Sequence, residues 1–386
     1  MRAPSALALL LLLIPVSRPA AAEGKPRDCA PLLEPIRARH DVPGMAGAVV
    51  EGDRLVALGA TGVRVRGKEP KVTVEDRWHL GSCTKAMTAT LCGMLVEEKR
   101  LSWTATVGGA FPDLAPAMDP KWKGVTLEQL LTHRGGAPAE LKFDDLWNRL
   151  RAFRGSPVEA RRVLLEGVVA RSPLFDPGTA FTYSNAGYAI AGSMAEGAAG
   201  KPWEALLRER IFRPLGMESA GFGAPGSAKA MDEPWGHRDD GTPIPPGPSA
   251  DNPAAIGPAS TVHTSIADWA KFAALHLRGD RGEARLLRKE TFARLHEPAD
   301  GRKEGYAMGW GVAVQPGSGG RVLTHAGSNT MWYCVAWIAP ERDFAVLVCC
   351  NRGGDAAEKA CEEASGALVQ EHLARGKPAS EPAGGK

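Results

Sequence analysis

The sequence predicts an α/β fold of the α+β type, in which helices flank an antiparallel sheet. Two observations indicate this fold: short apolar, partly β-branched runs lie near both ends of the chain, and segments with helical periodicity fill its middle. The simplest arrangement is one sheet domain built from both chain ends, with a mainly helical domain inserted. We therefore predict the sheet domain over residues 23–103 and 260–375 and the inserted domain over residues 104–259.

Length and composition narrow the class of protein. At ~150 residues per domain, a chain of 386 residues suggests about two domains. Hydrophobic residues make up 44% and charged residues 24%, an ordinary mixture for a globular protein. Lys and Arg number 47 against 44 Asp and Glu, for a net charge of +3, and no basic stripe is evident. Nucleic-acid binding is therefore not expected.

Residues 1–22 have the pattern of a secretory signal peptide. A charged start at Arg2 precedes an apolar stretch over residues 6–16 and the small-residue run 20–22. We predict cleavage after Ala22 and export to the periplasm or the medium. The alternative is a membrane anchor, but the apolar run is too short to span a bilayer easily, and no later segment offers ~18 unbroken apolar residues. No stable membrane span is expected after cleavage.

The N-terminal elements follow from apolar spacing. Residues 28–40 have helical spacing, and residues 45–50 and 54–60 are short apolar runs. The acidic, glycine-containing segment 51–53 between those runs indicates a hairpin turn. Residues 82–99 then predict a helix, because apolar side chains recur every three or four positions and the segment ends in Lys-Arg.

The middle of the chain is rich in proline and glycine, and its periodic segments are helical. Helices are expected at residues 127–131, 156–169, 186–199, 203–212 and 265–277. The proline-rich stretch 243–258 is expected to be a long irregular loop. Further on, apolar segments predict strands at residues 308–314, 322–323, 332–338 and 344–350. A closing helix is expected at residues 355–374, and the tail 376–386 is expected to be disordered.

Seven cysteines place few constraints on the chemistry. Their number is odd, so at least one thiol lacks an intrachain partner, and no CxxC pair supports zinc or thioredoxin chemistry. The adjacent Cys349 and Cys350 are expected to point to opposite faces of a strand. Buried apolar thiols are the simplest interpretation for most of the seven, and the disulfide pattern stays open.

Three short motifs carry candidate chemistry. The first is Ser82-Cys83-Thr84-Lys85, in which helical spacing brings the hydroxyl and the amine to one face. A serine hydroxyl is a weak nucleophile that needs a base, and a partly desolvated lysine can lose its proton near neutral pH. Taken alone, two common residues at this spacing can be a coincidence.

The second motif, Tyr183-Ser184-Asn185, follows a turn and opens a predicted helix. A phenol can relay a proton between nucleophile, base and leaving group. The amide of Asn185 can bond both the lysine and a substrate carbonyl. The alternative is a simple helix cap, since Ser and Asn favour helix starts.

The third motif is His325-Ala326-Gly327-Ser328, just before a predicted strand. Gly327 permits a substrate backbone to approach closely. The N–H of Ser328, together with the N–H of Ser82, suits an oxyanion hole. The alternative is an ordinary turn between strands.

The order and context of these motifs resemble the Ser-x-x-Lys, Ser/Tyr-x-Asn and Lys/His-x-Gly set of the penicillin-recognising serine hydrolases. The chain is identified as a member of the serine β-lactamase-like superfamily, on the branch of class C β-lactamases, DD-carboxypeptidases, D-aminopeptidases and short-chain esterases. The resemblance covers residues 30–372, with further similar segments at 130–136, 183–188, 212–217 and 258–260.

The resemblance implies the β-lactamase/transpeptidase-like fold, no metal and no organic cofactor. It implies that Ser82 is the acylated nucleophile, Lys85 the base and Tyr183 the proton shuttle. Substrate positioning and oxyanion binding would then belong to Asn185, His325, Gly327, Ser328 and the Ser82 amide. His133 lies in one of the family-like segments and is interpreted as structural.

His325 departs from the family pattern, because β-lactamases and penicillin-binding enzymes usually place Lys there. An imidazole with an ordinary pKa of ~6.5 is mostly neutral at neutral pH and is a poorer anchor for a substrate carboxylate. We therefore expect an exported serine hydrolase that acts through an acyl-enzyme on a small-molecule ester or D-amino-acid amide. Its pocket is expected to include the loop 243–258, since loops set specificity.

Several alternatives stay open at this point. Within the family, the chain can be a class C-like β-lactamase or a DD-carboxypeptidase. In a different class, it can be a non-catalytic sensor or binding domain that is acylated without turnover. Segment 221–226 matches GxGxxG, but it follows a helix and contains a proline, so dinucleotide binding is not expected. The natural substrate and the oligomeric state stay open.

Overall fold

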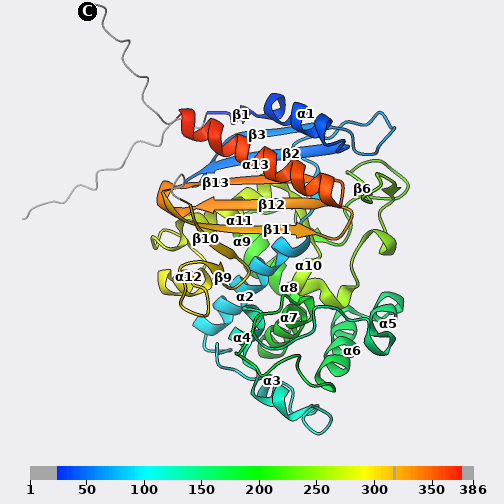
Figure 1. Cartoon of the computed structure of the whole chain (residues 1–386), viewed down its shortest axis with the longest axis vertical. Helices are drawn as coiled ribbons and strands as arrows, with labels where there is room; N and C mark the ends of the chain where they lie inside the picture. The colour runs from blue at the N-terminus through cyan, green and yellow to red at the C-terminus, as the bar shows by residue number, and fades with distance from the viewer. Residues whose placement is uncertain (1–23, 316–318, 376–386) are drawn as a thin grey trace, which may run out of the picture.

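A computed structural model describes residues 24–315 and 319–375 (Figure 1). Within them, eight strands form one sheet in the order β1-β3-β2-β13-β12-β11-β10-β9, and all neighbours are antiparallel except the parallel pair β1 and β3. These strands are β1 (Arg27–Asp28), β2 (Gly44–Glu51), β3 (Arg54–Gly62), β9 (Gly305–Tyr306), β10 (Gly311–Gln315), β11 (Gly320–Ser328), β12 (Tyr333–Ala339) and β13 (Phe344–Cys350). The sheet is therefore built from both chain ends, as the sequence predicts. The predicted signal peptide and tail lie outside the described residues.

Both faces of the sheet are covered by helices. Helices α1 (Ala30–Arg39) and α13 (Asp355–Arg375) lie across one face, and α11 (Ile266–Gly279) packs against β2 and β13 on the other (Figure 1). Alternate residues of β13 belong to the two layers: Phe344, Val346, Val348 and Cys350 to the first, and Ala345, Leu347 and Cys349 to the second. A strand buried on both faces needs such a continuous apolar run. The adjacent cysteines do point to opposite faces, and all seven thiols are free and buried.

The segment between the two halves of the sheet is mainly helical (Figure 1). Its helices and those that adjoin it are α2 (Thr84–Glu97), α3 (Val107–Ala110), α4 (Leu127–Leu131), α5 (Leu146–Ala152), α6 (Pro157–Val169), α7 (Asn185–Ala199), α8 (Trp203–Leu207), α9 (Arg213–Leu215), α10 (Gly257–Ser260) and α12 (Lys289–Leu295). Among the helices of the described residues, none has the length and apolar character needed to cross a membrane.

Short elements connect these helices to the sheet. A three-stranded sheet has the order β4 (Arg77–His79), β8 (Val262–Ser265) and β5 (Gly221–Phe222). A two-stranded sheet pairs β6 (Gly236–His237) with β7 (Pro243–Ile244). Single helical turns are η1 (Gly81–Cys83), η2 (Pro120–Gly124), η3 (Phe143–Asp145), η4 (Arg208–Phe212), η5 (Pro248–Ala250), η6 (Ala254–Ile256) and η8 (Pro340–Arg342). Strand β4 is followed after Leu80 by η1, where the Ser-x-x-Lys motif begins, and the motif continues into α2.

Side-chain caps account for several helix starts. Ser156 and Glu159 form a capping box at the start of α6, and the Ser265 hydroxyl accepts the Asp268 N–H at the start of α11. Such caps satisfy N–H donors that a helix start leaves unpaired. The helix starts predicted at residues 156 and 265 are therefore confirmed to within one residue.

Four predicted elements differ from the structure. The helix predicted from residue 82 opens with the turn η1, and the segment 203–212 passes from α8 into the π-helical turn η4. The strand predicted from residue 308 begins only with β10, because Gly309 has φ +83° and turns the chain past the start of α2. The loop 243–258 is less irregular than predicted, since it contains β7, η5 and η6.

Candidate active site

The three motifs meet where the start of α2, the start of α7 and the end of β11 come together (Figure 1). Ser82 lies in the turn η1, Lys85 in the first turn of α2, Asn185 at the first position of α7, and Ser328 at the last position of β11. Segments 100 or more residues apart in the chain thus supply one site.

Two glycines allow the backbones of the first and third motifs to touch. A Cβ on Gly327 would lie 2.0 Å from Leu80 O and 3.0 Å from Ser82 N. A Cβ on Gly81, which has φ +48°, would lie 2.4 Å from Ser328 N. Any side chain at either position would therefore push the two segments apart. The backbones of Ser82 and Ser328 are held next to each other, as an oxyanion hole requires.

Lys85 connects the first two motifs. Its Nζ lies 3.1 Å from Ser82 Oγ, 2.7 Å from Asn185 Oδ1 and 3.1 Å from Ala259 O. The side chain is fully buried, and burial lowers the pKa of its amine well below the ordinary value. A neutral amine has two N–H groups, which match the oxygens of Asn185 and Ala259, and its lone pair is then left for the Ser82 hydroxyl. Lys85 is therefore arranged to accept the serine proton.

Tyr183 holds a proton beside this pair. Its ring centroid lies 4.5 Å from Lys85 Nζ. Burial raises the pKa of the Tyr183 phenol above its ordinary value, and the neighbouring Ser82 hydroxyl offsets only part of that rise. The phenol therefore keeps its proton at neutral pH and can pass it on when a neighbour changes charge.

Ser184 shows that the helix-cap interpretation of the second motif is also correct. Its hydroxyl accepts the Gly187 N–H at 3.2 Å and so caps α7, and its own N–H donates to His133 Nδ1 at 3.1 Å. His133 lies against Tyr183, with ring centroids 4.3 Å apart, and burial lowers the pKa of His133 to about 2. The structure thus fits the structural interpretation of His133, which supports the backbone beside Tyr183 as a neutral ring.

His325 is a neutral imidazole in this environment. Burial, with a smaller effect from Lys85, lowers the pKa of His325 to about 3. Its Nδ1–H donates to Ala326 O at 2.6 Å, and its Nε2 accepts the Tyr306 hydroxyl at 3.1 Å. The third motif therefore offers the substrate a neutral ring rather than a positive charge at neutral pH.

Replacing Tyr306 with phenylalanine tests the importance of that second bond. The ring would stay packed against His133, while His325 would lose the donor at Nε2. Loss of one net hydrogen bond predicts a decrease of about 3- to 10-fold in kcat/KM, with little change in melting temperature. Steady-state kinetics and thermal unfolding of Tyr306→Phe check this, and an unchanged kcat/KM would show that the bond has no part in turnover.

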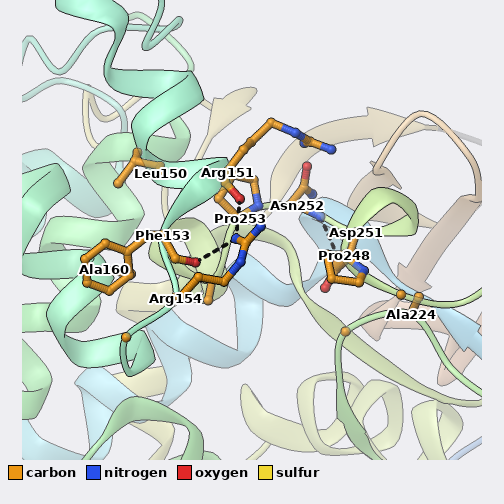
Figure 2. Close-up of a pocket in the computed structure, with 14 residues that line it drawn as sticks. Leu150, Arg151, Phe153, Arg154, Ala160, Ala224, Pro248, Asp251, Asn252 and Pro253 are labelled. Atoms are coloured by element: carbon orange, nitrogen blue, oxygen red, sulfur yellow. Dashed lines mark hydrogen bonds between the residues drawn. The ribbon is translucent and has the colours of Figure 1, made fainter.

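A cavity of about 410 Å³ lies beside the loop 243–258, and none of the residues of the three motifs lines it (Figure 2). Arg151 and Arg154 line one side of it, and Pro248, Asp251 and Asn252 line the other. The same loop reaches the motifs, because Asp251 Oδ1 lies 2.7 Å from His79 Nε2, just before the nucleophile turn. The loop 243–258 therefore contacts the segment just before the candidate nucleophile, while its part in a substrate pocket stays a prediction.

A serine whose proton can pass to a buried neutral lysine, next to paired backbone amides, is the arrangement by which one class of serine hydrolases takes up acyl groups. The chain belongs to the Beta-lactamase family, whose model matches residues 30–370. It is a serine hydrolase of that family.

Individual relatives agree with this assignment. The chain is 33% identical over 289 residues to penicillin-binding protein 4 of Amycolatopsis lactamdurans, covering 72% of each chain. It is 25% identical over 341 residues to an unguisins hydrolase of Aspergillus campestris, covering 84% of this chain and 61% of that protein. The octameric penicillin-binding protein homologue from Pyrococcus abyssi has the same fold, with a TM-score of 0.71, 23% identity, and coverage of 88% of this chain and 76% of that one.

Sequence reasoning missed two groups that touch the motif residues. Ala259 contributes only a carbonyl oxygen to Lys85, and a backbone oxygen leaves no trace in the sequence. Tyr306 lies on the two-residue strand β9, too short for a periodic signal. The available signal was its position between two glycines, Gly305 and Gly309, both of which have positive φ in the structure.

Proposed function

We propose that the protein hydrolyses a carboxylic ester or a D-amino-acid amide through an acyl-enzyme on Ser82. The observation that carries this proposal is the 3.1 Å contact between Ser82 Oγ and the buried amine of Lys85. The names of the relatives, a penicillin-binding protein and a hydrolase, support acyl transfer without specifying the acyl group.

The first half of the reaction forms the acyl-enzyme. The Ser82 Oγ bonds to the substrate carbonyl carbon while its proton passes to Lys85 Nζ, and the carbonyl oxygen becomes an oxyanion bound by the Ser82 and Ser328 amides. Asn185 keeps the amine aligned through its 2.7 Å bond. The leaving oxygen or nitrogen then takes the proton from Lys85 through the Tyr183 hydroxyl as its bond to the carbonyl carbon breaks.

The second half returns the enzyme to its starting state. Water attacks the acyl carbon while its proton passes to the same base, and the second tetrahedral intermediate forms in the same oxyanion hole. The Ser82 Oγ leaves with a proton, and a carboxylic acid is released. Each group is then in its original protonation state.

The neutral state of His325 supports the choice of substrate class. A fixed positive charge would hold a substrate carboxylate in place, but a ring whose pKa is lowered to about 3 supplies none at neutral pH. Its Nε2 is already occupied by Tyr306. Esters and amides without a carboxylate next to the scissile bond therefore fit this site better than β-lactams.

The test compares three chromogenic substrates in the wild-type protein and in Ser82→Ala: a p-nitrophenyl acyl ester, a D-alanine p-nitroanilide and nitrocefin. We expect the ester or the anilide to be preferred, and the variant to lose at least about 10³-fold in kcat. Strong preference for nitrocefin would contradict the proposed substrate class. A single burst of product without turnover would instead indicate an acylated sensor domain.

We also propose that the protein is exported, on the basis of residues 1–22 alone. Expression of the full chain in a bacterial host should yield protein outside the cytoplasm whose N-terminal sequence begins at Glu23. Recovery of the protein only in the cytoplasm, with Met1 or Arg2 at its N-terminus, would contradict export.

A further inference from the structure

His79 is a fully buried histidine three residues before the candidate nucleophile. Its Nδ1 accepts the Gly81 N–H at 3.1 Å, and its Nε2 lies 2.7 Å from Asp251 Oδ1. Because Nδ1 accepts a hydrogen bond, the ring proton is on Nε2, which donates it to the carboxylate. Asp251 thus selects the tautomer whose lone pair holds Gly81.

The residue next to Asp251 reaches the other side of the site. Ala250 O accepts a hydrogen bond from Asn329 Nδ2 at 3.1 Å, and Asn329 directly follows Ser328 in the chain. The Asn329 amide is itself held, because its Oδ1 accepts the N–H groups of Met331 and Trp332 at 3.1 and 3.2 Å. Only 4% of Asn329 is exposed, so water does not compete for these bonds.

A further contact links the His79 side of this network to the Asn329 side. The His79 imidazole stacks on Trp332, with centroids 5.6 Å apart and planes 28° apart, and Trp332 is the residue whose N–H bonds to Asn329. We call His79, Ala250, Asp251 and Asn329 the loop clamp. Two consecutive loop residues therefore hold both the turn η1 and the end of β11.

The backbones that the clamp holds are the ones that touch in the site. Gly81 and Ser328 are so close that a Cβ on Gly81 would lie 2.4 Å from Ser328 N. The amides of Ser82 and Ser328 lie within one residue of the clamped positions. A shift of either segment would change the separation of these two amides.

We propose that the loop clamp is a set of positioning residues that fixes the spacing of the two oxyanion-binding amides, those of Ser82 and Ser328. The clamp acts on the two amides through the backbone segments that it holds. This inference rests on the proposed function, because the two amides matter only where an acyl group forms an oxyanion. A purely structural role predicts lost stability, whereas a positioning role predicts a specific loss of oxyanion binding.

The test uses Asp251→Ala and Asn329→Ala, with a p-nitrophenyl ester and the thionoester of the same acyl group. N–H donors stabilise a sulfur anion less than an oxygen anion. If the two amides are displaced, the enzyme should therefore lose more activity on the ester than on the thionoester. We expect each variant to lower kcat/KM for the ester by about 10-fold with KM nearly unchanged. The ester-to-thionoester ratio, which is kcat/KM for the ester divided by kcat/KM for the thionoester, should fall by about 3-fold or more.

Two further variants separate positioning from stability. Asp251→Asn can still offer an oxygen to His79 and should recover kcat/KM to within about 3-fold of wild type. His276→Gln is the control, since His276 is equally buried and hydrogen-bonded to Thr90 and His296 but does not contact the clamp. It should lower the melting temperature without changing the ester-to-thionoester ratio. An unchanged ratio in both alanine variants would overturn the proposal, whatever their stability.

A second measurement keeps the clamp testable if the protein does not turn over esters. A fluorophosphonate reacts with Ser82 by forming an O–P bond and releasing fluoride, and the phosphoryl oxygen occupies the oxyanion hole. In that case the substrate class proposed above is wrong, but the rate of phosphonylation should still fall by about 10-fold in the alanine variants. An equal rate in wild type and both variants would overturn the clamp. If one alanine variant fails to fold, the other decides.

Discussion

Replacing Lys85 with methionine should lower kcat/KM by about 10³- to 10⁴-fold, because the serine loses the group that accepts its proton. The same substitution should leave the free energy of unfolding at neutral pH unchanged or higher. Lys85 is fully buried, and burial lowers the pKa of its amine well below the ordinary value of 10.5. Folding at neutral pH therefore includes the cost of removing a proton from this lysine, and a methionine has no such cost.

The stability difference between wild type and Lys85→Met should depend on pH. Between the lowered pKa of folded Lys85 and 10.5, the unfolded chain binds one proton more than the folded chain. The free energy of unfolding of the wild-type protein therefore rises with pH in this range. The stability advantage of Lys85→Met should thus be largest at neutral pH and disappear as the pH approaches 10.5. Two oxygens, those of Asn185 and Ala259, lose a donor and offset part of the gain by about 1–3 kcal/mol. Urea unfolding of both proteins across this range measures the difference.

Two results would contradict this account of Lys85. Retention of kcat/KM to within about 10-fold would show that another base serves Ser82. A stability loss that stays the same at every pH would show that Lys85 is not neutral in the folded protein.

The second large effect is acid destabilisation by buried histidines. Burial lowers the pKa of five of them below the ordinary value of 6.5: His133 to about 2, His325 to about 3, His237 and His263 to about 4, and His276 well below 6.5. Below 6.5 the unfolded chain protonates these rings before the folded chain does, so stability is fully present above that pH and falls as the pH drops. Each ring contributes up to about 1.4 kcal/mol per pH unit within its own window.

Urea unfolding at a series of pH values between neutral and the first signs of acid unfolding measures this slope. We expect the free energy of unfolding to fall more steeply with decreasing pH than the uptake of one proton would cause, because several rings titrate in the same pH range. His276→Gln should show a shallower slope than wild type, since one such ring is removed. The pKa of His237 and His263 is about 4 in the folded protein. A free energy of unfolding that stays constant from neutral pH down to that value would contradict the assignment of these rings as neutral and buried.

The parts of the fold that the sequence predicted are those with local signals. Strand β13 is an unbroken apolar run because both its faces are buried, and α6 begins with a Ser-x-x-Glu cap. The predictions that failed at their boundaries depend on contacts with distant segments. Gly309 turns the chain because it passes the backbone of Ala86, 223 positions earlier, and nothing in the local sequence around Gly309 shows that neighbour.

The candidate site divides in the same way. Ser82 and Lys85 could be paired from spacing alone, because one turn of helix separates them. Tyr183, Asn185 and His325 could be added only because three motifs occur in a known order, since their contacts span 100 residues or more. The bonds of His79 to Asp251 and of Asn329 to Ala250 join distant segments too short to carry a periodic signal, so they required the structure.

The most direct test of the central claim is to trap the acyl-enzyme. Wild-type protein mixed briefly with a p-nitrophenyl ester, quenched in acid and digested should yield one peptide, the one that contains Ser82, with the added mass of the acyl group. The fragment spectrum should place that mass on the serine, and Ser82→Ala should yield no acylated peptide. Turnover of the ester without acylation of Ser82, or with the acyl group on another residue, would contradict the mechanism.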